Sequence, residues 1–93
     1  AKNLELRQKA VAVMDQLPHT GKFSRRSISE IHYDSKDGFW VTLINGGIKV
    51  KLGQDAVPIK SARVSQVLEY MDNRQLEARV IDANLSKKVL VRL

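Results

Sequence analysis

The sequence predicts an α+β fold in which two helices pack on one face of an antiparallel sheet, in the order α-β-β-β-α-β-β. Apolar residues recur every three or four positions over residues 6–17 and 64–71, which is the period of a helix. Over residues 28–52 and 78–93 they alternate with polar residues, which is the period of a strand with one buried face. The sheet is expected to consist of a three-stranded meander and a C-terminal hairpin.

Length and composition limit the possible classes. Ninety-three residues suffice for one core, so residues 1–93 are expected to form a single domain. The absence of cysteine excludes thiolate metal sites, cysteine nucleophiles and disulfides. The sequence contains no apolar run near the roughly 20 residues that cross a bilayer.

The first helix is predicted from five apolar residues that share one face: Leu6, Ala10, Val13, Met14 and Leu17. It should end before Pro18, because proline cannot continue a helix. The following segment, residues 19–26, is polar and basic and contains Gly21, so we expect a loop with Phe23 turned inward.

The meander is centred on Asn45-Gly46, which favours a type I′ hairpin turn. This turn pairs only apolar residues on the buried face: Leu43 with Ile48, Val41 with Val50 and Phe39 with Leu52. A loop over residues 34–38 then pairs Tyr33 with Phe39 and Ile31 with Val41. The outer face carries two mixed rows, namely His32, Trp40 and Lys51, and Glu30, Thr42 and Lys49.

The second helix should begin near Pro58, with Asp55 as a candidate N-cap. Its buried stripe is Val64, Val67, Leu68 and Met71, while Lys60 and Arg63 lie towards its edge. The last hairpin is predicted over residues 78–85 and 89–93 with Ser86-Lys87-Lys88 as its loop. That loop pairs Leu85 with Val89, Ala83 with Val91, Ile81 with Leu93 and Asp82 with Arg92.

Catalytic chemistry is not expected. The sequence has two histidines, and His32 has Ser29 and Asp34 near it only along the chain, where alternate strand residues face opposite ways. The carboxylates show no metal-ligand spacing, and Gly46-Gly47 fits a turn better than a phosphate loop. No cofactor or metal is therefore predicted, and an enzyme fragment ranks third among the possible functions.

The net charge of +6 leaves open a small basic RNA- or DNA-binding module as the alternative function. Such modules use several aromatic residues on an open sheet face, and this predicted outer face has only Trp40. We therefore expect weak binding of nucleic acid. Trp40 is interpreted as a structural residue with Lys51 against its ring, and a binding platform is the competing interpretation.

Several segments together resemble the FtsQ/DivIB cell-division family. These are GFWVTLINGGIKVKLG at residues 38–53, the helix with Lys60, Arg63 and Leu68 in a K-x-x-R spacing, and ARVIDANLSKKVLVRL at residues 78–93. The resemblance implies the extracytoplasmic β-domain of a single-pass protein of the bacterial inner membrane, on its periplasmic side. It further implies that a membrane helix and a POTRA domain lie outside this chain.

The resemblance also implies a non-catalytic scaffold that binds FtsB- and FtsL-like division proteins and helps to regulate septal wall synthesis. A partner is expected to add a β-strand to the final strand, because an edge strand offers unpaired main-chain groups. The candidate partner-binding residues are Lys87, Lys88, Val89, Leu90, Val91, Arg92 and Leu93, with Arg63 and Trp40 as possible secondary contacts. The competing interpretation is a sheet edge whose charges keep molecules apart.

Overall fold

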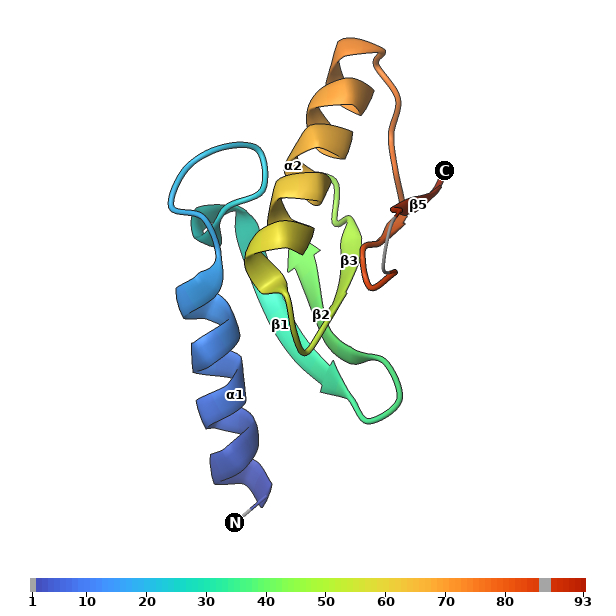
Figure 1. Ribbon diagram of the computed structural model, residues 1–93. Helices are drawn as coiled ribbons and strands as arrows, with labels where there is room; N and C mark the ends of the chain where they lie inside the picture. The colour runs from blue at the N-terminus through green and yellow to red at the C-terminus, as the bar shows by residue number, and fades with distance from the viewer. Residues whose placement is uncertain (1, 86–87) are drawn as a thin grey trace.

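The computed structural model describes residues 2–85 and 88–93 (Figure 1). Two helices and five strands confirm the α+β class. In chain order they are α1 (Lys2–Gln16), the 3₁₀ helix η1 (Arg25–Ser27), β1 (Ile28–Asp34), β2 (Gly38–Leu43), β3 (Lys49–Gly53), α2 (Val57–Asn73), β4 (Val80–Asp82) and β5 (Leu90–Arg92). The observed order differs from the predicted one in detail, because η1 precedes the sheet.

The sheet is mixed, so the prediction of a purely antiparallel sheet was wrong. The strands lie in the order β1-β2-β3-β4-β5, and β3 pairs with β4 in parallel. The reason is the crossover: α2 carries the chain back along the sheet, so β4 starts at the same end as β3 (Figure 1). Alternation of apolar residues identifies a buried face, but it carries no information on strand direction.

The predicted register of the meander is largely confirmed. Val41 pairs with Val50, Ile31 with Val41 and Tyr33 with Phe39. A bulge between Phe39 and Trp40 places Phe39 opposite Gly53 instead of Leu52. The turn also differs, because positive φ falls on Gly46 and Gly47 and not on Asn45.

Both helices contribute to one core with the inner face of the sheet. Val13 and Leu17 of α1 are buried there, and so are Val57, Val64 and Met71 of α2. The loop between α1 and the sheet supplies Phe23, which is fully buried as predicted. Strand residues complete the cluster: Phe39, Val41, Leu43, Val50, Leu52 and Ile81.

The last hairpin has a different register from the predicted one. Ile81 pairs with Val91 and not with Leu93, and Asp82 pairs with Leu90 and not with Arg92. Among the described residues, 83–85 and 88–89 lie outside the two strands, so the predicted strand bounds of 78–85 and 89–93 were too long. Ser86 and Lys87 of the predicted three-residue loop lie outside the described residues.

Candidate binding edge of the sheet

β5 forms one edge of the sheet and is the most exposed strand. It pairs with β4 on one side only. Leu90 is 53% exposed and Leu93, just beyond the strand, is 62% exposed, while Val91 and Arg92 are also exposed. An apolar edge strand of this kind is a template for pairing with another chain.

The direction of the main-chain groups along β5 follows from its neighbours. The Lys49 amide donates to the Arg79 carbonyl (3.0 Å) and the Ala83 amide to the Lys51 carbonyl (3.0 Å), so the Arg79 carbonyl and the Ala83 amide are directed to β3. The Arg79 amide instead donates to the Arg92 carbonyl (2.8 Å), which shows that Arg92 faces back from β5. Because alternate residues of a strand point their amides and carbonyls to opposite neighbours, Val80 and Asp82 face β5. Their pairing partners Arg92 and Leu90 face back to β4. Val91 and Leu93 therefore carry the main-chain groups of the free edge.

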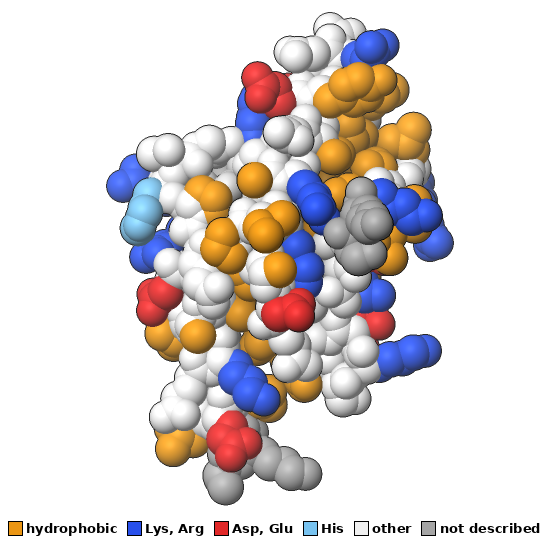
Figure 2. Space-filling model, viewed as in Figure 1, with side chains coloured by type: hydrophobic (Ala, Val, Ile, Leu, Met, Phe, Trp, Pro, Cys, Tyr) orange, Lys and Arg blue, Asp and Glu red, His pale blue; other side chains and the backbone are white. Residues whose placement is uncertain are grey.

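An apolar groove of about 430 Å³ lies between this edge and α2. Its lining comes from the C-terminal half of α2, the segment after it and β5: Gln66, Val67, Tyr70, Met71, Leu76, Val91 and Leu93. Figure 2 shows hydrophobic side chains gathered over this part of the molecule. Since Val91 lies opposite the buried Ile81, the groove continues the inner face of the sheet beyond the part that α2 covers.

The opposite edge, β1, has a different character. Glu30, His32 and Asp34 are exposed along it, and a register irregularity between Ile28 and Glu30 disturbs its pairing. Charge and bulges are common protections of a sheet edge. Among the described residues, the large hydrophobic side chains that are strongly exposed include none from β1. Of the two edges, β5 is therefore the better suited to accept a strand.

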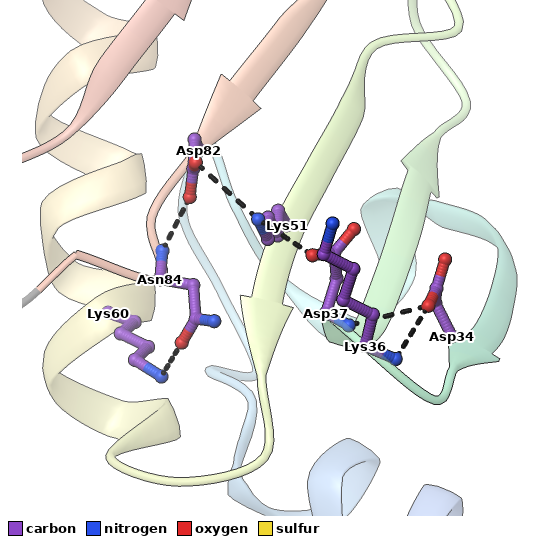
Figure 3. A network of polar contacts seen from close by, with 7 residues as sticks. All are labelled: Asp34, Lys36, Asp37, Lys51, Lys60, Asp82 and Asn84. Atoms are coloured by element: carbon purple, nitrogen blue, oxygen red, sulfur yellow. Dashed lines mark hydrogen bonds and ion pairs between the residues drawn. The ribbon is translucent and has the colours of Figure 1, made fainter.

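The outer face of the sheet holds a charged cluster around Lys51 (Figure 3). The Lys51 ammonium lies 3.1 Å from an Asp37 carboxylate oxygen, 3.8 Å from one of Asp82 and 5.9 Å from the Trp40 ring centroid. The hydrogen bond from Lys51 to Asp37 is the main cause that raises the pKa of the lysine. The distance from the Lys51 ammonium to the Trp40 ring confirms the predicted cation–π contact.

Lys60 lies at a buried junction of α2 with the ends of β3 and β4, so its predicted place towards the helix edge was wrong. The residue is 6% exposed, and its ammonium donates to the Leu52 carbonyl (2.7 Å), the Asn84 side-chain oxygen (2.8 Å) and an Asp55 carboxylate oxygen (3.0 Å). The hydrogen bond from Lys60 lowers the pKa of the exposed Asp55 carboxyl.

Asp55 does not cap α2, which the sequence had suggested. The N-cap position is Ala56, in the left-handed conformation with φ 52°, and no side chain caps the helix there. A signal for the burial of Lys60 was present in the sequence: it follows Val57 by three positions and precedes Val64 by four.

The structure brings together part of the predicted binding set. Leu90, Val91, Arg92 and Leu93 form the edge, Lys88 is exposed beside it, Val89 packs against the core, and Lys87 lies outside the described residues. Arg63 is half-buried and donates to the Leu85 carbonyl at 3.5 Å, next to the connection that leads to β5. Trp40 lies on β2, and β3 and β4 separate it from β5.

Residues 2–85 and 88–93 contain no group of three or more histidine and carboxylate side chains arranged to hold a metal ion. Neither helix within the part of the chain that the structure describes has the length and apolar character needed to cross a membrane.

Comparison with known proteins gives one consistent result. Residues 2–84 match the family described as cell division protein FtsQ/DivIB, C-terminal. Cell division protein FtsQ of a Geobacter species is 32% identical over 88 residues, which cover 95% of this chain and 32% of that protein. Cell division protein FtsQ of Syntrophotalea carbinolica is 26% identical over 85 residues, covering 91% of this chain and 30% of that protein. The chain thus spans about a third of these curated relatives.

Proposed function

Because the chain belongs to the FtsQ/DivIB C-terminal family, we propose that it is a non-catalytic scaffold domain that binds other division proteins. The proposed partners resemble FtsB and FtsL, and the proposed role is to help assemble and regulate septal wall synthesis. The whole protein is proposed to be anchored in the bacterial inner membrane by a single helix, with this domain on the periplasmic side.

The observation that carries the proposal is the exposed edge strand β5 beside an apolar groove. An added strand would pair with the main-chain groups of Val91 and Leu93, and its alternate side chains would enter the groove along α2. On the outer face, Leu90 offers an apolar contact and Arg92 a charge for an acidic partner residue.

The test uses synthetic peptides that together cover the FtsB-like division protein of the same organism, and the peptide that binds the parent domain is then used with the variants. Val91→Pro removes the edge amide, and a proline is tolerated where the amide faces away from the sheet. We expect Val91→Pro to weaken peptide binding at least tenfold by titration calorimetry. Val91→Ala removes most of the groove contact and leaves the amide in place, so the difference between the two variants isolates main-chain pairing.

A control is His32→Ala on β1, which changes an exposed side chain of the opposite edge. It should leave peptide affinity within about twofold of the parent if the variant remains folded by circular dichroism. Unchanged peptide binding by a folded Val91→Pro domain would refute strand addition at β5. Amide exchange on the complex would also refute it if protection appeared along β1 and not along β5.

A further inference from the structure

The final hairpin has two registers that its apolar pattern cannot distinguish. A three-residue loop would place Ile81 opposite Leu93, whereas the structure has Ile81 opposite Val91. A shift of two residues returns every side chain to the same face of the sheet, because the strand period is two. Both registers therefore bury the same face, and a feature outside that face must select between them.

Asn84 is the residue that separates the two registers. In the predicted register β4 continues through Asn84, whose side chain would then share the outer face with Asp82. In the structure the Asn84 amide donates instead to the Asp82 carboxylate (3.0 Å), which turns the chain out of the strand. The Asn84 side-chain oxygen then accepts the hydrogen bond from Lys60 of α2, which packs on the inner face (Figure 3). The bond between Lys60 and Asn84 and the predicted register are mutually exclusive.

The position of Lys60 is fixed by its other contacts. Its ammonium is held by the Leu52 carbonyl at the end of β3, and Gly53 leaves the space that the Asn84 side chain occupies. A Cβ atom at Gly53 would lie 2.2 Å from the Asn84 side-chain oxygen. Three segments thus converge on one hydrogen bond: the end of β3, the first turn of α2 and the residue that ends the β4 segment.

We propose that Lys60 and Asn84 are positioning residues for the binding edge. Their hydrogen bond ends β4 near Asp82 and selects the register in which Val91 lies beside the groove. Loss of the bond lets β5 move by two residues, which is about 7 Å along the strand. The effect on binding rests on the proposed function, but the register itself can be measured without a partner.

Paired cysteines report the register, because the natural chain has none. The pair Val80→Cys with Arg92→Cys joins directly opposed residues in the observed register. The pair Ala83→Cys with Val91→Cys joins directly opposed residues only in the register shifted by two residues. In the observed register these two positions are diagonal to each other. The ratio of the two oxidation rates, each measured in a separate domain under the same redox buffer, gives the preference for each register.

Three substitutions are compared in both cysteine backgrounds. Asn84→Ala removes the acceptor, and we expect it to shift the rate ratio at least tenfold towards the Ala83–Val91 pair. Asn84→Asp keeps an oxygen for Lys60 and should restore the parent ratio. Asp55→Ala removes the exposed acceptor of the same lysine and should leave the ratio within about twofold. A general loss of stability would not favour one pair over the other.

An unchanged ratio in the folded Asn84→Ala domain would overturn the proposal, as would an equal shift in Asn84→Asp. Protection of the Ala83 amide, which donates to the Lys51 carbonyl, verifies that β3 and β4 remain paired. Peptide titration then distinguishes the two proposals. A shifted ratio with unchanged peptide affinity means that β5 is not the partner edge, although Lys60 and Asn84 still position it. If peptide binding depends on Val91 but not on Asn84, and the rate ratio is unchanged, strand addition at β5 is supported. The positioning role of Lys60 and Asn84 is then rejected.

Discussion

Gly53 is required where β3, α2 and the chain after β4 meet. Its φ is 78°, a conformation that residues with a side chain rarely adopt. The same position has no room for a Cβ atom, because Asn84 lies against its backbone. Gly38 is similarly restricted, since a Cβ atom there would lie 2.7 Å from the Gly53 Cα atom. The ends of neighbouring strands can approach this closely only with glycine on both.

We expect Gly53→Ala to lower the free energy of unfolding by at least about 2 kcal/mol, from positive φ together with overpacking. Gly47→Ala is the matched control, because Gly47 has φ 63° and no neighbour within 4 Å of a Cβ atom. It should cost about 1 kcal/mol. Urea unfolding measures both. In an Asn84→Ala background the cost of Gly53→Ala should fall to that of Gly47→Ala, and equal costs in both backgrounds would contradict the close-packing explanation.

At the scale of elements, the apolar pattern predicted the pairing of strands that are close in sequence. The meander register was predictable because hairpin loops are short and the buried face must be uniformly apolar, as for Ile31, Val41 and Val50. The parallel pairing of β3 with β4 was not, because it depends on the path of α2. The predicted register of the final hairpin was wrong, and we attribute this to the hydrogen bond between Lys60 and Asn84. From the sequence alone a lysine at this position is expected to be exposed, because its tertiary partners are not known.

The two faces of α1 allow a test of how this helix is anchored. Val13 is buried in the core, while Val11 is exposed on the same helix. Val13→Ala should destabilise the domain by about 2 kcal/mol, because it removes two buried methyl groups and leaves a cavity. Val11→Ala should stay within about 0.5 kcal/mol of the parent. Thermal unfolding followed by circular dichroism compares them, and similar costs would mean that α1 is not docked in solution as it is here.

At the scale of the whole molecule, several of the basic side chains are engaged within the domain, although this pairing leaves the net charge of +6 unchanged. Lys22 is paired with Asp72, Lys51 lies between Asp37 and Asp82, and Lys60 is buried against Leu52 and Asn84. These lysines belong to the structure of the domain and are poorly placed to displace counterions from a phosphate backbone. Trp40, the aromatic residue of the outer face, has the Lys51 ammonium over its ring.

The engagement of these lysines in the fold and the single outer-face aromatic residue predict weak binding of nucleic acid despite the basic composition. A labelled 20-nucleotide single strand and the matching duplex should bind with dissociation constants weaker than about 1 μM at 150 mM salt by fluorescence anisotropy, in the range of nonspecific contacts. Any binding at low salt should decline steeply as salt rises, because it arises from phosphate contacts alone. Binding of the division-protein peptide should change much less over the same range, since main-chain pairing and apolar contact dominate it. Submicromolar, sequence-selective oligonucleotide binding that persists at 150 mM salt would instead favour a nucleic-acid-binding module.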